Sequence, residues 1–224
     1  MFAGCWHLTR ACIESGYRAG PSIDILPAFG GGHKFDILTS AGRRVVWAIL
    51  VCLRPMWVHS GYPCTFWSSL AHCTRNRDEI LNEQVRKREL VYIFFTRQIA
   101  NWQVRQGRHV SIENPPRCYS WKLDVVRDMI YSCNLKCVDM HVCMWGAKDP
   151  GNHLAYRKPM RLASDIDLSP LIRLCDGTHT HQVVEGRVCS GEHRGKKRST
   201  ISGKYPMELC RAWVKHMHEH IGSN

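Results

Sequence analysis

One cysteine of this chain follows a predicted strand directly. Cys64 lies in GYPCTFWSS, after the apolar run RPMWVH, and an apolar run that ends in Gly and Pro is typical of a buried strand that stops at a turn. Doubly wound folds keep their chemistry just beyond the carboxyl ends of such strands. Cys64 is therefore a candidate reactive residue. The alternative is that this thiol only fills a gap in the core, as buried cysteines often do.

Two acids occupy comparable places. Asp24 ends the short apolar stretch PSIDIL, and Glu113 lies in IENP, at the end of the run RHVS. A carboxyl group at a strand end is placed to accept hydrogen bonds from a ligand, or to donate one when it is protonated. Each acid also has a purely structural interpretation, because Asp24 stands in a turn before Pro27 and ENPP is itself a turn sequence.

Cysteine and histidine gather in two stretches of the C-terminal half. DMHVCMWG contains His141 and Cys143, and LCDGTHTH contains Cys175, His179 and His181. Thiolate and imidazole are the ligands that a structural zinc ion prefers. Because the chain has 12 Cys and 13 His, chance clustering is the alternative. The candidate zinc ligands are Cys143, Cys175, His179 and His181.

The remaining histidine-rich and basic stretches are weaker candidates for a catalytic or metal-binding site. HMHEH, near the C-terminus, is typical of a solvated helix end. GKKRST, at 195–200, has the composition of a phosphate-binding or nuclear-import segment and equally that of a flexible basic loop.

The apolar pattern predicts the elements that position these residues. We expect helices at 8–16, 43–53 and 77–106, and strands at 21–27, 54–63 and 108–115. Alternating strands and helices favour a doubly wound, mostly parallel sheet with helices on both faces. Beyond residue 150 we expect loop and edge strand at 150–165, a short helix at 168–175, a basic loop at 191–206 and a final helix at 207–221. The expected domains are an α/β core at 1–150 and an irregular, basic, Cys/His-rich extension at 151–224.

The composition is that of an ordinary globular protein with a basic surface. Of the 224 residues, 44% are hydrophobic and 22% charged, and the formal net charge of +12 favours an anionic partner, most simply nucleic acid. The longest apolar stretch, VVWAILVCL, is too short to cross a bilayer, and no signal peptide is recognisable. We therefore expect reduced cysteines and an intracellular protein of the nucleus or cytoplasm.

Four short motifs occur in an informative order: FAGC, IDIL, YPCT and IENP. This order resembles the DNA cytosine-5 methyltransferases, in particular the divergent methylase-like domains of phages and of mobile-element (retrotransposon) polyproteins. Ser68 and Trp121 match further positions of those domains, which share a similar Cys-Gly-His-x-His segment. The resemblance covers about the first two thirds of the chain and implies a Rossmann-like fold that uses S-adenosylmethionine.

The resemblance also implies roles for individual residues at a cofactor site. Asp24 would accept the ribose hydroxyls of S-adenosylmethionine, Asp36 would face its adenine amine, and Pro63 would border the same site. The loop around the methionine part of the cofactor would consist of Phe2, Ala3, Gly4 and Cys5. Because the chain begins at this loop, the resemblance further implies an N-terminally truncated domain without most of its first strand.

The implied reaction needs a nucleophile. Cytosine is too electron-rich to accept a methyl group at C5 directly, so the Cys64 thiolate would first add at C6, while Glu113 would protonate or hydrogen-bond N3. The target base would have to leave the duplex.

Three features depart from the family pattern. Trp6 stands where a glycine is expected, Tyr62 replaces a proline, and no Gln-x-Arg-x-Arg segment is present. Two functions therefore stay open: a methyltransferase-like domain that acts on cytosine in DNA, and a catalytically inactive nucleic-acid-binding module of a mobile-element polyprotein. The pairing of Cys64 with Glu113 favours the enzyme, and the departures favour the binding module.

Overall fold

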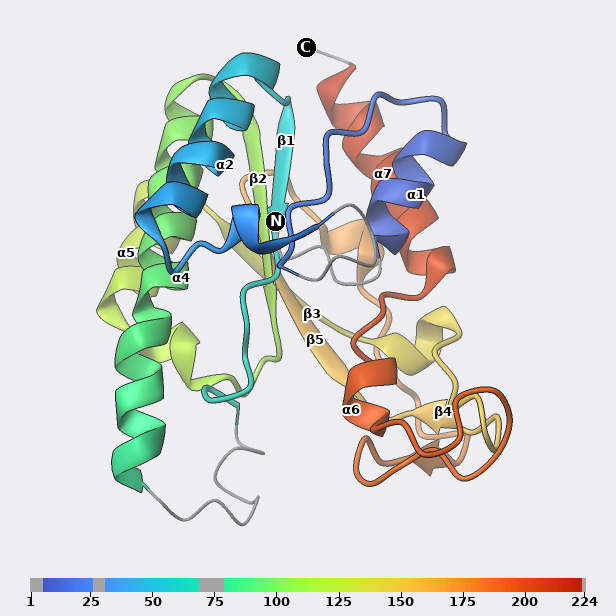
Figure 1. The fold of residues 1–224 in the computed structure, drawn as a ribbon. Helices are drawn as coiled ribbons and strands as arrows, with labels where there is room; N and C mark the ends of the chain where they lie inside the picture. The colour runs from blue at the N-terminus through green and yellow to red at the C-terminus, as the bar shows by residue number, and fades with distance from the viewer. Residues whose placement is uncertain (1–5, 26–30, 69–78, 223–224) are drawn as a thin grey trace. The chain divides into compact units, whose positions relative to one another are not determined.

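The computed structural model describes residues 6–25, 31–68 and 79–222, which form two compact units (Figure 1). The first unit consists of Met1–Ala3, Gly20–Cys137 and Leu162–Asp167, and the second of Gly4–Ala19, Val138–Arg161 and Leu168–Asn224. Each unit thus combines separate stretches of the chain. The expected domain boundary at residue 150 stays a prediction.

The first unit contains three long helices and two neighbouring parallel strands. The helices are α2 (Ser40–Leu53), α4 (Glu79–Arg105) and α5 (Asp124–Ser132), and the strands are β1 (Trp57–Ser60) and β2 (His109–Asn114). Short 3-10 turns lie at η2 (His33–Phe35) and η3 (Tyr119–Lys122). Helix α4 contacts both strands and α5 packs on α4, so these helices cover one face of the strand pair (Figure 1).

Local sequence explains where α2 begins and ends. The Thr39 hydroxyl accepts a hydrogen bond from the amide of Gly42 at 2.9 Å and so caps the first turn. Gly42 is required there, since a Cβ would collide with the backbone of Asp36. Arg54 ends the helix in the left-handed region (φ 46°), and Pro55 follows.

Helix α4 and strand β2 form the centre of the first unit's core. Ile93 and Ile99 on α4 are almost completely buried, as are Val110 and Ile112 on β2. Gly107 separates the two elements with φ +65°, a conformation that side chains other than glycine adopt at a cost. This burial agrees with the helical period expected over 77–106.

The sheet differs from the expected one. Four strands have the order β1-β2-β5-β3, with β3 at Lys136–His141 and β5 at Pro159–Ser164, and the division between the units passes through β3 and β5. This sheet is mixed, and a separate parallel pair joins β4 (Ala155–Tyr156) to β6 (His181–Gln182).

The expectation of a doubly wound, mostly parallel sheet is therefore wrong. Consecutive parallel strands need a crossover connection, usually a helix, but β3 and β5 are joined by residues 142–158, which hold only a 3-10 turn and a short strand. The strand expected at 21–27 also does not form in its described residues, which end at Ile25.

The second unit is built on α7 (Met207–Ile221), which matches the final helix expected at 207–221. It packs against α1 (His7–Glu14), where Glu14 pairs with Arg10 at 2.7 Å and with Arg211 at 3.0 Å. Further short helices are η4 (Val142–Trp145), η5 (Ser169–Leu171) and α6 (Arg198–Ile201). The buried face of α7 comprises Leu209, Cys210, Trp213, Val214 and Met217.

A buried ion pair joins Asp149 to Arg198 in the second unit. Asp149 is completely buried and accepts a hydrogen bond from Nε of Arg198 at 2.6 Å, from the Tyr156 hydroxyl at 3.2 Å and from the Gly151 amide at 2.8 Å. Burial alone would raise the pKa of Asp149, but these hydrogen bonds, led by Arg198, lower it below its usual value. Asp149 thereby ties the start of α6, through Arg198, to β4, through Tyr156.

Within the part of the chain that the structure describes, no helix has both the length and the apolar character needed to span a membrane.

Candidate metal centre

Four candidate zinc ligands converge in the second unit. One ligand atom from each of Cys143, Cys175, His179 and His181 lies within 4.8 Å of the others. We call this set the Cys/His cluster. The expectation from sequence is confirmed to this extent: the cluster is arranged so that it could hold a metal ion.

Three elements bring the cluster together. Cys143 lies on η4, Cys175 and His179 lie in the loop after η5, and His181 begins β6. The parallel pairing of β6 with β4 aligns His181 with Ala155. Because β4 follows η4 in the chain, this pairing returns the His181 strand towards the Cys143 turn.

The loop between the second and third ligands has its own local structure. The Asp176 carboxylate accepts hydrogen bonds from the amide and the hydroxyl of Thr178, at 3.0 and 2.8 Å. Gly177 adopts φ +78°, and its amide points at the Cys175 sulfur at 3.4 Å. This local structure orders the loop that carries Cys175 and His179.

A second layer of side chains orients the ligands. His141 accepts a hydrogen bond at Nδ1 from the Cys175 amide at 2.9 Å. Nδ1 of His179 lies 4.0 Å from an Asp176 carboxylate oxygen, while its Nε2 faces the Cys175 sulfur. Metal-bound histidines commonly have such a carboxylate behind the ring. These supporting roles were not predicted from the sequence, although His141 and Asp176 lie within two residues of a ligand.

The two distances from Cys175 to the histidine ligands match those expected for tetrahedral coordination. The Cys175 sulfur lies 3.7 Å from Nε2 of His179 and 3.4 Å from Nε2 of His181. Zn–S bonds of about 2.3 Å and Zn–N bonds of about 2.0–2.1 Å place neighbouring tetrahedral ligands about 3.3–3.8 Å apart. The two histidines therefore already hold nearly the separation from Cys175 that a shared zinc ion requires.

The surroundings of the Cys/His cluster shift the pKa values of Cys143 and His181 towards their neutral forms. Burial raises the pKa of Cys143 to about 11, with further contributions from the hydrogen bond and the charge of Cys175. Burial also lowers the pKa of His181, and the positive charges of His179, Arg157 and His141 act in the same direction. A neutral His181 is ready to bind a metal, whereas Cys143 needs a nearby cation to lose its proton.

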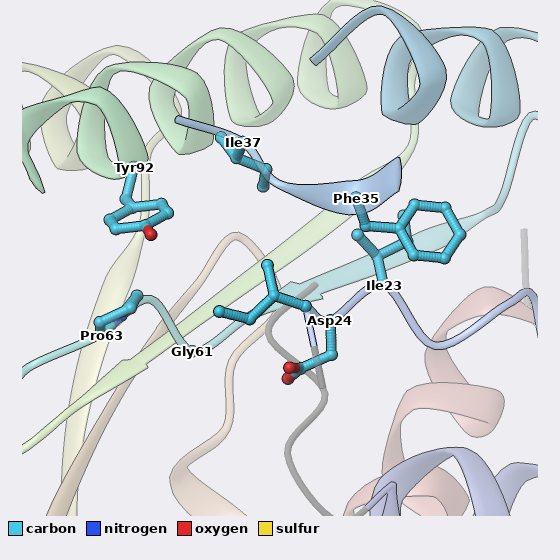
Figure 2. Close-up of a pocket in the computed structure, with 8 residues that line it drawn as sticks. Ile23, Asp24, Phe35, Ile37, Gly61, Pro63 and Tyr92 are labelled. Carbon is cyan, nitrogen blue, oxygen red and sulfur yellow. The ribbon is translucent and has the colours of Figure 1, made fainter. Parts of the chain in front are cut away.

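Two of the predicted cofactor residues line a cavity of about 300 Å³ in the first unit (Figure 2). Asp24 and Pro63 line this cavity, together with apolar residues and Tyr92 from α4. Asp36 does not line it; its carboxylate accepts the Leu38 amide at 3.0 Å. The predicted loop residues Phe2, Ala3, Gly4 and Cys5 lie outside the described residues.

The predicted catalytic residues, Cys64 and Glu113, lie near the carboxyl ends of the parallel strands β1 and β2. Cys64 is half-buried four residues after β1 ends, and Glu113 is half-buried on β2. Tyr62 lies close to both. Burial raises the pKa of the Tyr62 hydroxyl, and the charges of Cys118, Glu113 and Cys64 raise it further, against a hydrogen bond to Ser120 that lowers it.

Hydrogen bonds tie the Cys64 loop to the loop after β2. The Tyr62 hydroxyl donates to Ser120 at 3.2 Å, the Asn114 amide group donates to the Tyr62 carbonyl at 3.5 Å, and the Tyr119 amide donates to the Trp67 carbonyl at 2.6 Å. The sequence marked Tyr62 only as a departure from the family pattern. Its tertiary role is to connect the two loops that carry the predicted pair.

The fold and the site together define a class: a mixed α/β protein of two compact units, with a Cys₂His₂ candidate metal centre in the second. No protein-family model, no curated protein and no solved structure matches the chain.

Proposed function

We propose that the first unit is an S-adenosylmethionine-dependent methyltransferase site that acts on cytosine in DNA. One observation carries the proposal: residues from three separate stretches lie at one place. Asp24 and Pro63 share a cavity wall, Cys64 follows Pro63 directly, and Cys64 and Glu113 both influence the Tyr62 hydroxyl. If the short motifs matched only by chance, there would be no reason for these residues to lie close together in the fold.

The cavity has the chemistry of a nucleoside site. Its volume of about 300 Å³ lies at the lower end of the range for small-molecule pockets, and Ile23, Phe35 and Ile37 provide an apolar wall (Figure 2). The Asp24 carboxylate in the same wall suits ribose hydroxyls, which donate hydrogen bonds. These residues fit the nucleoside part of S-adenosylmethionine, which would supply the methyl group when bound.

The chain's own residues would perform the remaining steps. The Cys64 thiolate would add to C6 of cytosine, and Glu113 would hold or protonate N3, so that the ring accepts this addition. Expulsion of the thiolate in a final elimination would release the product. Tyr62 and Asn114 would keep the two loops in register through the hydrogen bonds described above.

Calorimetry with S-adenosylmethionine tests the cofactor site. The full chain is expected to bind one equivalent, and Asp24→Asn is expected to weaken binding about tenfold or more, because hydrogen bonds to a charged group contribute about 1.5–3 kcal/mol each. Asp128→Asn is the matched control, since its side chain is 63% exposed on α5. An absence of heat from the wild-type chain would refute the cofactor assignment.

We further infer that the Cys/His cluster binds one structural zinc ion. Two sulfurs and two imidazole nitrogens lie within 4.8 Å of one another, and the two Cys175–histidine pairs have tetrahedral spacing. This ligand set favours zinc over metals that prefer oxygen ligands or square-planar geometry. All four ligands come from the protein, which is typical of a structural site, since a catalytic zinc keeps one position open. The ion would join η4, the loop after η5 and β6.

The basic loop is the expected contact with nucleic acid. Arg194, Lys196 and Lys197 are exposed, whereas Arg198 is held by Asp149 and is left unchanged in the test. Replacing the three exposed residues by Ala is expected to lower affinity about equally for unrelated duplexes. The salt dependence of log K should flatten by about 0.9 for each phosphate that the loop no longer neutralises.

A fluorescence-anisotropy titration at several salt concentrations measures this slope. The control removes the same charge elsewhere, by changing the exposed residues Lys122, Arg127 and Lys136 to Ala. Equal slopes for the loop variant and the wild type would show that the basic loop does not contact phosphate.

A further inference from the structure

Tyr119, at the start of η3, is an aromatic residue that the fold keeps at the surface. It is 52% exposed, whereas its chain neighbours Cys118 and Ser120 are almost completely buried. Trp121, the next residue of η3, is buried as well. Because the buried residues on both sides fix the backbone, the exposure of the Tyr119 ring is set by the fold.

Hydrogen bonds fix the loop that carries Tyr119. The Cys118 amide donates to the Pro115 carbonyl at 2.9 Å, and the indole nitrogen of Trp121 donates to the same carbonyl at 2.8 Å. The Tyr119 amide donates at 2.6 Å to the carbonyl of Trp67, in the Cys64 loop (residues 61–68). A ring on a backbone fixed in this way loses little conformational entropy when a ligand covers it.

Tyr119 lies at the edge of the sheet where we place methyl transfer. Strands β1 and β2 are parallel and in register, so their carboxyl ends meet at one edge. Cys64 follows the end of β1 and Tyr119 follows the end of β2, and the hydrogen bond to Trp67 joins the two loops directly. The exposed ring therefore stands beside the Cys64 loop.

The charges around Tyr119 are positive. Arg117, two residues before it, is exposed, and residues 115–121 contain no acid. From the other side, Arg86 on α4 donates its Nε to the Phe66 carbonyl at 2.8 Å and so brings its charge to the Cys64 loop. Residues 61–68 contain no acidic or basic side chain that would offset it. An exposed aromatic ring bordered by guanidinium groups results.

This combination is the one by which proteins hold unpaired nucleotides. Aromatic side chains stack on bases of any sequence, and neighbouring cations neutralise the phosphates. In an intact duplex both faces of each base are already covered by its neighbours, so a protein ring can stack only on a base that has left the helix or lies in a single strand.

We propose that Tyr119 and Arg117 bind an unpaired nucleotide next to the target cytosine. The Tyr119 ring stacks on its base, and the Arg117 guanidinium contacts a phosphate of the same strand. The inference rests on the proposed function only in taking nucleic acid as the partner of this edge. It adds the form of that partner, a strand opened beside the Cys64 loop.

Fluorescence anisotropy of the full chain tests the stacking with two labelled probes: a single-stranded oligonucleotide and an abasic strand of the same length. The wild type is expected to bind the strand with bases about tenfold more tightly. Tyr119→Ala should lose about tenfold in affinity for that strand and little for the abasic one, whereas Tyr119→Phe, which keeps the ring, should bind as the wild type. Tyr131→Ala is the matched control, since Tyr131 is 89% exposed on α5 of the same unit.

The salt dependence separates the role of Arg117. Arg117→Gln should flatten the slope of log K for the single strand by about 0.7, the value for one phosphate contact, while Tyr119→Ala should leave the slope unchanged. Arg127→Gln is the control, because the Arg127 side chain is 70% exposed on α5. An intact duplex offers no unpaired base, so the duplex titration of the basic loop does not report on this surface.

Equal affinities of Tyr119→Ala and Tyr131→Ala for the single strand would overturn the inference. So would equal binding of the two probes by the wild type, a result that requires no variant to fold. Covalent trapping at Cys64 without any effect of Tyr119→Ala would remove this inference and leave the methyl-transfer proposal. Base-dependent binding through Tyr119 by a chain that neither binds S-adenosylmethionine nor is trapped would support the inference and remove the methyl-transfer proposal.

Discussion

Substitution of Cys175 by Ser is expected to remove zinc from the chain. The Cys175 sulfur lies 3.7 Å from Nε2 of His179 and 3.4 Å from Nε2 of His181. Structural zinc sites contribute about 10–16 kcal/mol of apparent binding free energy in small peptides, so loss of one ligand should also destabilise the surrounding loop and β6. Metal analysis of the purified protein should give about one zinc per wild-type chain and none in the variant.

Cys189→Ser is the matched control for this experiment. Cys189 is an exposed cysteine of the same unit that lies outside the cluster, so its substitution should retain the metal. A chelator should reproduce the Cys175→Ser result in the wild type. Equal zinc content in Cys175→Ser and Cys189→Ser, or none in the wild type after reconstitution with zinc, would refute the site.

Zinc affinity should also rise with pH. Without metal the pKa of Cys143 is raised to about 11, so its thiol is protonated at neutral pH and zinc must displace that proton. Binding therefore releases protons, and each fall in pH makes this release more costly. Proton release measured by calorimetry in buffers of different ionisation enthalpy checks this expectation.

DNA that carries 5-fluorocytosine is expected to trap the chain covalently through Cys64 when S-adenosylmethionine is present. Fluorine at C5 prevents the final elimination, so the bond between the Cys64 sulfur and C6 persists and the complex migrates as a heavier band. Cys64→Ser should abolish the band. Glu113→Gln should slow its formation about 10²- to 10⁴-fold, the usual contribution of an acid–base residue.

Two other cysteines serve as controls. Cys118 is buried near Tyr62, and burial raises its pKa, so Cys118→Ser should still be trapped. Cys52 is exposed on α2, and Cys52→Ser should behave as the wild type. A band of unchanged intensity in Cys64→Ser would contradict the assignment. A wild-type chain that binds this DNA reversibly without any band would instead support the inactive nucleic-acid-binding module.

Elements whose cause is local can be predicted from the sequence alone. The apolar period over 77–106 predicted α4, and the run at 207–221 predicted α7, because helical hydrogen bonds and amphipathic faces depend on residues three or four positions apart. The ligand types in the Cys/His cluster were also readable, since zinc chemistry restricts them to thiolate and imidazole.

Features that depend on partners distant in the chain become visible only in the folded structure. Pro21–Ile25 has strand-like composition, yet a strand forms only where another backbone pairs with it, and the mixed order β1-β2-β5-β3 depends on the same long-range pairing. The convergence of Cys143 with Cys175 and the link from Tyr62 to Ser120 have the same origin. Hydrogen bonds and charges act over a few ångströms in space, and distance along the chain does not limit which groups they join.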